Sequence, residues 1–441
     1  MGATTSRHRR FPPDGRLIGL ALAVVATLYL TISTLTLLNW GFNYDEAGGN
    51  VFEKIHPATF VAAATLLLAG LMQGNPLTAI IGALDRYPGT ALFVAMIGIL
   101  IAYSIKIVGL PFTAFFDTFL APVMVFFLFK DMRKERACRF VWLIHSLMVL
   151  NAVIGIGEFI SGERLTPIVA SGMVIADDWR STALLGHPLA NASLTGAYLL
   201  SLALGGAKDL PKPFAAGAFI VNAAAMVVFG GRASSVILLV LLGVLAARGG
   251  LRILRGERFD KTAVLTALIV IPIVALALTT LVEAGFFDQF LARFIDDKGS
   301  AEARVYMFEL FQHLSWYELL LAPDPDQMAT LKRIYDLDFG IESFWISFVL
   351  SYGIIPGLAF FAALFLFCRD VLRSIRPGGI WVFVFFFLVA STSVSLSSKS
   401  TVFAELLLMM LVMFRRPQIE MAHRSVRRSS HMMTSKVTVS A

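Results

Sequence analysis

Long uninterrupted runs of apolar residues are the feature that most constrains this chain. A helix needs about 20 apolar residues to cross the roughly 30 Å of hydrocarbon in a bilayer, and about twelve such runs can be counted along the sequence. They lie at 17–38, 57–73, 90–108, 112–129, 140–160, 188–206, 213–230, 233–247, 263–284, 342–367, 379–396 and 402–414. The sequence therefore predicts an all-α, polytopic integral membrane protein with about 12 transmembrane helices.

The composition agrees with this prediction. Of the 441 residues, 57% are hydrophobic and only 15% are charged, whereas soluble domains are about half apolar and about a quarter charged. Water-soluble enzymes, disordered proteins and nucleic-acid binders all need more polar surface than this chain supplies. We therefore expect membrane lipid, and no nucleic acid, among its partners.

The positions of the charges predict which side of the membrane each loop faces. If the N-terminus is cytoplasmic, 26 of the 37 Lys and Arg residues fall in segments on that side, as the enrichment of cytoplasmic loops in these residues requires. The acidic residues show the opposite bias, with 21 of 30 on the outer side. Both termini are therefore predicted to be cytoplasmic, and each outer Arg or Lys is a functional candidate, because topology does not explain it.

The predicted organisation has three parts. A basic N-terminus, 1–16, precedes a transmembrane domain at 17–414, and a tail at 415–441, rich in Ser, Arg and Met, is expected to be disordered. Two outer loops are longer than a turn, at about 161–187 and 285–341, and loops of this length are usually functional. Within the second loop, 301–321 mixes aromatic residues and Leu with charges at helical spacing, which predicts an amphipathic helix on the outer membrane surface.

Three outer cations are candidates for binding an anionic substrate. Arg232 follows two glycines in FGGRASS, where backbone N–H groups and a helix N-terminus favour an anion; alternatively, it caps a tight turn. Arg304 opens the predicted amphipathic helix, where a surface ion pair with Glu302 or Glu309 is the alternative. Arg180 lies in the first outer loop.

Four further residues have candidate roles. Glu342, where the second loop enters a span, is a possible general base or a favourable charge at a helix N-terminus. His187, before Pro188, is either a substrate-binding residue or an ordinary loop residue. His313 is a candidate catalytic residue or an interfacial one, and Lys399 is an outer cation near hydrocarbon.

Known nucleotide and metal motifs are missing from the sequence. It contains no Walker-type phosphate loop, no dinucleotide Gly fingerprint, no HExxH and no CxxC pair. No cofactor and no metal site is therefore predicted.

Four segments resemble a known family. GHPLANASLTGAYLL, FGGRASSVILLVLLG, SAEARVYMFELF and ESFWISFVLSYGIIPGLAFF, spread over about 180–365, are similar to motifs of the bacterial O-antigen ligase and polysaccharide polymerase superfamily. The resemblance implies a metal-independent membrane glycosyltransferase of the bacterial inner membrane with its active site facing the periplasm. Its donor would be a glycan on undecaprenyl diphosphate, and Arg232 and Arg304 would hold the diphosphate leaving group. A regulator of chain length would be a further partner.

One departure from the family pattern bears on the reaction. Ligases of the family have a His at the position of Glu342, so the resemblance favours an O-antigen or exopolysaccharide polymerase with Glu342 as the base. His187 and His313 are alternatives for this role. Two other functions remain open: an O-antigen ligase acting on lipid A core, and a secondary transporter or flippase, for which ionisable residues near mid-bilayer would be expected.

Overall fold

The computed structural model describes residues 11–45, 48–108, 112–170, 173–175, 178–256, 279–280, 282–283, 285–295, 300–335, 337, 340–393, 396 and 398–416. The predicted all-α class is confirmed, since within these residues the only strands are β1 (Val169–Ala170) and β2 (Met173–Val174), which pair antiparallel. The predicted span 263–284 and the tail after Arg416 lie almost entirely outside the described residues, as does most of the basic N-terminus.

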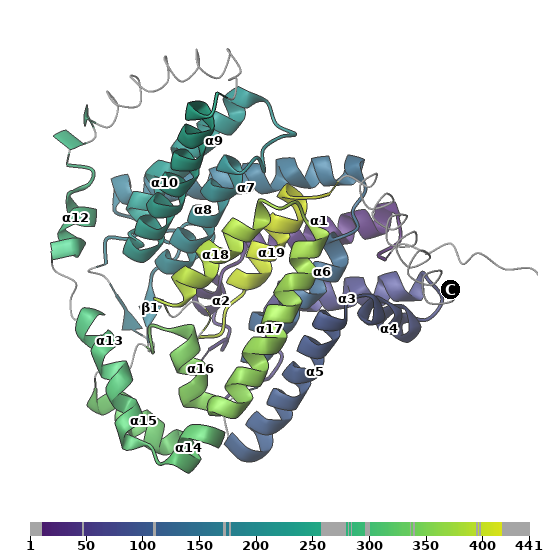
Figure 1. Cartoon of the computed structure of the whole chain (residues 1–441), viewed down its shortest axis with the longest axis vertical. Helices are drawn as coiled ribbons and strands as arrows, with labels where there is room; N and C mark the ends of the chain where they lie inside the picture. The colour runs from purple at the N-terminus through teal and green to yellow at the C-terminus, as the bar shows by residue number, and fades with distance from the viewer. Residues whose placement is uncertain are drawn as a thin grey trace, which may run out of the picture.

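Most of the helices fall within the predicted apolar runs, whereas those at Pro76–Arg86, Asp288–Ile295 and Pro325–Ile334 lie outside them (Figure 1). Their bounds are α1 Arg16–Thr31, α2 Thr34–Asn39, α3 Pro57–Leu71, α4 Pro76–Arg86, α5 Pro88–Tyr103, the π-helical turns η1 Ser104–Val108 and η2 Phe116–Leu120, α6 Ala121–Phe129, α7 Lys134–Ser161, α8 Pro188–Ala203, α9 Lys212–Phe229, α10 Arg232–Leu254, α12 Asp288–Ile295, α13 Ser300–Glu309, the 3₁₀ turn η3 Leu310–His313, α14 Trp316–Leu321, α15 Pro325–Ile334, α16 Phe344–Tyr352, α17 Ile354–Ser374, α18 Gly379–Ala390 and α19 Val402–Met413.

Several of these helices have the length and composition of membrane spans. Among the described residues, five segments qualify, at Pro88–Lys106, Lys134–Ser161, Lys212–Phe229, Arg232–Arg252 and Ile354–Ser374. A sixth would be α3 with α4, which meet at an angle of 102°. The protein thus has the character of a membrane protein, while the number of twelve spans and their sidedness stay predictions.

Two predicted spans are interrupted, contrary to expectation. The run 17–38 breaks after α1, because Ser33 starts a new helix by accepting a hydrogen bond from the backbone N–H of Thr36 at 3.1 Å. The run 342–367 breaks at Gly353, which has a positive φ of 87°. A side chain there would also collide with the backbone of Leu321, so only glycine fits.

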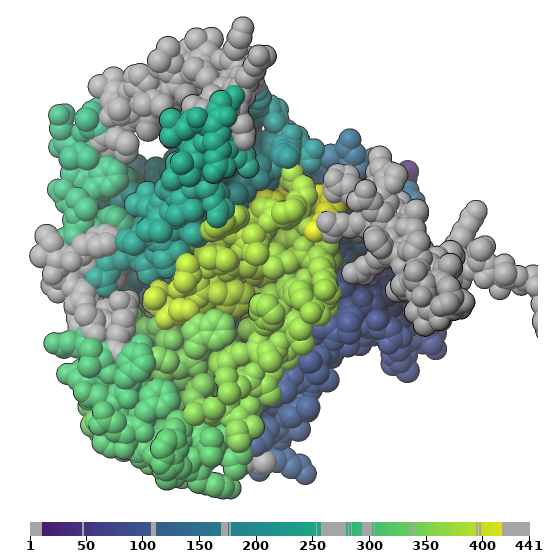
Figure 2. Space-filling view, in the orientation of Figure 1, coloured from purple at the N-terminus to yellow at the C-terminus, as the bar shows by residue number. Residues whose placement is uncertain are grey.

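The predicted amphipathic helix at 301–321 is also divided, into α13, η3 and α14. Ser315 and Glu318 form a reciprocal capping box that starts α14, and the extended backbone of Leu314 separates it from η3. The side chains of Trp316 and Tyr317 on α14 are 79% and 72% exposed. These three helices and α15 form the lower left edge of the molecule (Figure 2).

The centre of the bundle consists of α6 and α19, in which every residue is buried. Both helices are too short to cross a bilayer alone at 1.5 Å per residue, and a helix that is apolar on all sides is expected to be enclosed by others. Around them, α5 packs along α17, with the rings of Phe93 and Phe367 stacked at 5.0 Å. α10, α17 and α18 are exposed on the face shown in Figure 2.

Candidate functional site

The N-termini of several helices meet in one region of the bundle. The start of α10 lies against α8, because a Cβ atom on Gly231 would stand 2.3 Å from the Cβ of Ala192. The residue before the start of α8 is His187, and its neighbour Gly186 packs equally tightly on Ser33, which begins α2. The N-termini of α2, α8 and α10 are therefore adjacent.

The N-termini of α3, η2 and α19 continue this region. His56, the residue before α3, contacts the backbone oxygen of Ile32 through Nε2 at 2.8 Å. In η2, Asp117 accepts a hydrogen bond from the His56 backbone N–H at 3.0 Å, and the next residue, Thr118, accepts one from the N–H of Ser400 at 3.1 Å. Ser400 lies two residues before α19.

α16 completes the set, because the ring of Phe344 at its start lies 6.1 Å from that of Phe119 in η2. We call the region where these helices begin the convergent end. Helix N-termini carry partial positive charge and unpaired N–H groups. The C-termini of α1, α9 and α18 lie at the same end, so an anionic ligand is favoured locally, at the N–H groups that begin individual helices and beside the cations there.

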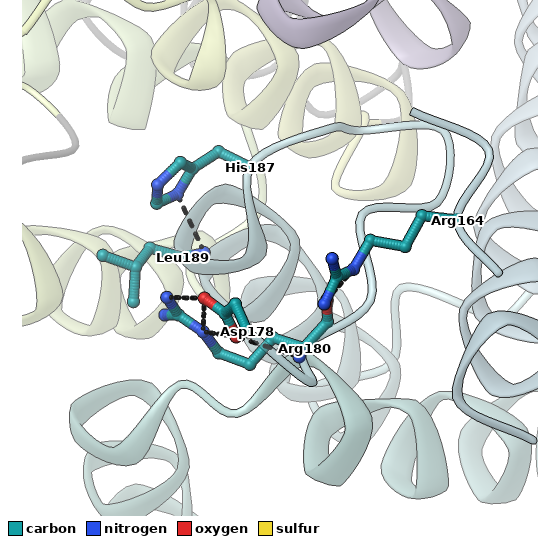
Figure 3. A network of polar contacts seen from close by, with 5 residues as sticks. All are labelled: Arg164, Asp178, Arg180, His187 and Leu189. Carbon is teal, nitrogen blue, oxygen red and sulfur yellow. Dashed lines mark hydrogen bonds and ion pairs between the residues drawn. The ribbon is translucent and has the colours of Figure 1, made fainter. Parts of the chain in front are cut away.

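Arg180 lies at the convergent end in a defined ion pair. Its guanidinium bonds the carboxylate of Asp178 through Nε at 2.9 Å and through Nη2 at 2.5 Å (Figure 3). Although partial burial opposes ionisation, these contacts hold the pKa of Asp178 below its usual value. The aliphatic part of the Arg180 side chain packs on Gly230, where a Cβ would be 2.9 Å away. Arg180 is thus beside the glycines that precede Arg232.

His187, the residue before α8, projects on the same side as the guanidinium of Arg180 (Figure 3). Its Nδ1 accepts a hydrogen bond from the backbone N–H of Leu189 at 3.2 Å. Part of the ring is exposed to solvent, and the protein packed around the rest lowers its pKa below the usual value, with the Arg180 cation acting in the same direction. His187 is therefore neutral at pH 7.

The loop that carries Arg180 and His187 is held by polar side chains that the sequence analysis missed. The Glu158 carboxylate accepts hydrogen bonds from the backbone N–H groups of Leu165, Thr182 and Ala183 at 2.7–2.9 Å. The amide oxygen of Asn151, two turns earlier on α7, accepts hydrogen bonds from the backbone N–H groups of residues 184 and 185. Both side chains are buried within an apolar helix, so their lone pairs replace the partners that water would provide.

Arg232 and Glu342 are both placed at helix N-termini of the convergent end. Arg232 is the first residue of α10, and Glu342 precedes Ser343, from which α16 starts. Both side chains are partly buried. The start of α16 is also tied to the C-terminal end of α18, by a 2.6 Å hydrogen bond from the Trp345 indole to the hydroxyl of Ser391.

Lys399 also lies at the convergent end, over the ring of Tyr44. Its ammonium donates to the backbone oxygen of Tyr44 at 2.6 Å and lies 3.6 Å from the centroid of the tyrosine ring. Burial lowers the pKa of Lys399 to about 8, although the nearby carboxylates of Asp117 and Asp45 oppose this shift. The lysine therefore keeps its charge at neutral pH.

Asp117, which was not predicted as a functional residue, is the centre of a hydrogen-bond network that includes Tyr44. It is fully buried and accepts hydrogen bonds from the hydroxyl of Tyr44 at 2.8 Å, the hydroxyl of Thr59 at 2.6 Å and the backbone N–H of His56. Because an ionised carboxylate is only an acceptor, these donors suit it well. Asp117 thus joins the loop before α3, the start of α3 and η2.

Asp117→Asn is expected to lower the free energy of unfolding by about 3 kcal/mol, because the amide presents an N–H₂ group to a donor and leaves it unsatisfied. Thermal unfolding of the detergent-purified protein measures this. Tyr44→Phe, which removes one of the donors, should cost about 1 kcal/mol. Equal stability of Asp117→Asn and wild type would show that the network does not hold these elements together.

Two predicted site residues are not joined to the convergent end by a described contact. His313 lies in η3, where its ring is exposed and Nε2 is 2.7 Å from the hydroxyl of Tyr335, the residue after α15. Arg304 lies in α13, but its side chain is outside the described residues. Among the described residues, no group of three or more His, Cys, Asp or Glu side chains could hold a metal ion.

Comparison with known proteins gives no further assignment. No protein-family model matches the chain, and a search of the curated proteins finds no similar sequence. The function must therefore be argued from the residues of the convergent end.

Proposed function

We propose that this protein is a polysaccharide polymerase of the bacterial inner membrane. It transfers a glycan from undecaprenyl diphosphate to a sugar hydroxyl of another lipid-linked repeat, on the periplasmic face. The observation that carries the proposal is the convergent end, where helix N-termini meet the cations Arg180, Arg232 and Lys399. A diphosphate is an anion that such a region would favour.

The proposed reaction is a displacement at the anomeric carbon of the donor sugar. The acceptor hydroxyl forms the new bond to this carbon while the bond to the diphosphate oxygen breaks. Glu342 takes the proton of the hydroxyl, and the lipid diphosphate leaves with the additional negative charge. Arg232, with Arg304 of the outer loop, stabilises this charge as it develops, which lowers the barrier.

The predicted topology supports a periplasmic site. Alternation from a cytoplasmic N-terminus makes the spans at 57–73, 112–129, 188–206, 233–247, 342–367 and 402–414 begin on the outer side. The structure brings together the N-termini of α3, η2, α8, α10, α16 and α19, which begin these same runs. This arrangement is the one that alternating spans require, and the bias of Lys and Arg residues in the loops is the reason for assigning this end to the outer side.

The lipid-linked glycans of a deletion strain test the proposal. Loss of the protein should leave single repeat units on undecaprenyl diphosphate and no polymer, and the wild-type gene should restore the polymer. Full-length polymer trapped on the carrier lipid would instead indicate a ligase that transfers it to lipid A core. An unchanged profile would contradict both, and would favour a transporter or flippase.

The pKa of Lys399 predicts the pH dependence of the reaction. Since its pKa is lowered to about 8, the ammonium is present below this pH and is lost above it, with roughly a tenth remaining one unit higher. Polymer formation from lipid-linked repeats by the purified protein should therefore fall between about pH 7 and pH 9. Lys399→Arg, which stays charged, should flatten this fall, and an identical fall in both proteins would exclude Lys399 as its origin.

A further inference from the structure

Two helices of the convergent end begin with the same dipeptide. His56-Pro57 starts α3 and His187-Pro188 starts α8. In each, Nδ1 of the imidazole accepts the backbone N–H two residues later, from Ala58 at 3.1 Å and from Leu189 at 3.2 Å. Short polar residues such as Ser, Thr, Asp and Asn cap helices at least as well. Capping uses only Nδ1, so the role of the second ring nitrogen, Nε2, requires an explanation.

At His56, the ring face and Nε2 both make structural contacts. The ring stacks on Tyr29 with centroids 5.8 Å apart, and Nε2 donates to the backbone oxygen of Ile32. Burial lowers the pKa of His56, which favours the neutral ring with a single N–H group. Because Nδ1 accepts a hydrogen bond, that proton is on Nε2.

At His187 the same cap fixes the same tautomer, with a different result. Nδ1 is the acceptor, so the neutral ring carries its proton on Nε2. No residue in the described part of the chain accepts a hydrogen bond from this nitrogen, and the ring is exposed. It projects on the same side of α8 as the guanidinium of Arg180. A donor of fixed orientation is thus on the same side of α8 as the ion pair of Arg180 and Asp178.

We propose that His187 uses its Nε2–H to donate a hydrogen bond to a phosphate oxygen of the bound substrate, in the same site as Arg180. This inference rests on the proposed function, because it requires a diphosphate substrate. It also excludes His187 as the general base. The lone pair of Nδ1 is engaged by the Leu189 N–H, and Nε2 already carries a proton, so neither nitrogen is able to accept one from the acceptor hydroxyl.

Three substitutions separate the cap from the donor. His187→Asn keeps a good helix cap but is too short to place a donor where Nε2 lies. His187→Gln places an amide N–H near the position of Nε2 and is the weaker cap. His187→Ala removes both. Polymer made in the deletion strain reports activity, and thermal unfolding of the purified variants reports stability.

The proposal predicts that Gln and Asn exchange rank between the two readouts. His187→Gln should retain much of the wild-type polymer, whereas His187→Asn and His187→Ala should make about ten- to a hundred-fold less, as expected for loss of one hydrogen bond to a charged group. His187→Asn should be the most stable of the three. A merely capping role predicts that Asn retains more activity than Gln, and a general base predicts that Gln is as inactive as Ala; either result would overturn the proposal.

Histidine nitrogen spectra provide a test without activity, because the chain has only 7 His residues. On addition of inorganic pyrophosphate to ¹⁵N-His protein, the Nε2 resonance of His187 should shift. That of His56, which has the same cap but donates to Ile32, should not shift and is the matched control. If the wild-type gene restores polymer in the deletion strain but the His187 signal does not shift, the inference is rejected and the proposed function is retained. An unchanged glycan profile in the deletion strain would reject the proposed function.

Discussion

Arg232→Ala is expected to abolish polymer formation while leaving the protein in the membrane. Arg232 is the first residue of α10 and is partly buried at the convergent end. Alanine is a strong helix former, so α10 should keep its start, and the loss should come from the missing guanidinium. Arg232→Lys should be inactive as well, because a single ammonium does not reproduce the two-pronged hydrogen bonding of Arg to phosphate.

The matched control lies on the same helix. Arg252, near the other end of α10, is exposed, and Arg252→Ala removes the same charge without touching the convergent end. It should make polymer of wild-type length. The lipid-linked glycan profile of the complemented deletion strain measures both variants, alongside immunoblots of the membrane fraction. Wild-type chain length in Arg232→Ala would contradict the assignment of this residue to the substrate.

The positions of the helices were predictable, but their interruptions were not. The predicted runs begin at Pro57 and Pro188, where α3 and α8 start, and the run at 90–108 begins two residues after Pro88, which starts α5; proline is well suited to a first turn. The interruptions at Ser33 and Gly353 fall inside runs that remain apolar on both sides. Hydropathy does not distinguish a continuous helix from two helices joined at a cap, since the cap depends on backbone geometry and on a distant partner such as Leu321.

The candidate site was predictable to the extent that its residues were unusual for their location. Arg180, Arg232 and Lys399 were selected as cations on a side with no topological need for them, and the structure places all three at the convergent end. His313 was selected on the same predicted side, but its described hydrogen bonds are with Gln327 in α15 and with Tyr335, which follows α15. Sidedness alone therefore does not determine which outer residues meet.

The polar residues that hold the site were missed for a physical reason. Asp117 and Glu158 each lie within or at the end of an apolar run, and their partners are distant in sequence: Tyr44 is 73 residues from Asp117, and Thr182 is 24 residues from Glu158. A single carboxylate in an apolar helix is a signal of function or of a buried network. Only the fold shows which groups donate hydrogen bonds to it.

Gly231→Ala should reduce polymer nearly as strongly as the loss of Arg232, although it removes no polar group. Its Cβ would stand 2.3 Å from the Cβ of Ala192, far inside van der Waals contact, so the start of α10 must move away from α8. Arg232 is the next residue and moves with it. A misplacement of about 1 Å at a site of this kind costs about a hundredfold in rate. Gly217→Ala, on α9, meets open space at its Cβ and should be active.

The cause of this loss is tested by a second substitution on the facing helix. Ala192→Gly removes the other carbon atom of the clash, so the double variant Gly231→Ala with Ala192→Gly should recover most of the polymer. Ala192 is fully buried, so Ala192→Gly alone should cost about 2 kcal/mol of stability, from lower helix propensity and the loss of a buried methyl group. Recovery would mean that the distance between the two helix N-termini sets activity. A double variant as inactive as Gly231→Ala would mean that glycine 231 acts through its backbone, and that the close approach of α8 and α10 is not what positions Arg232.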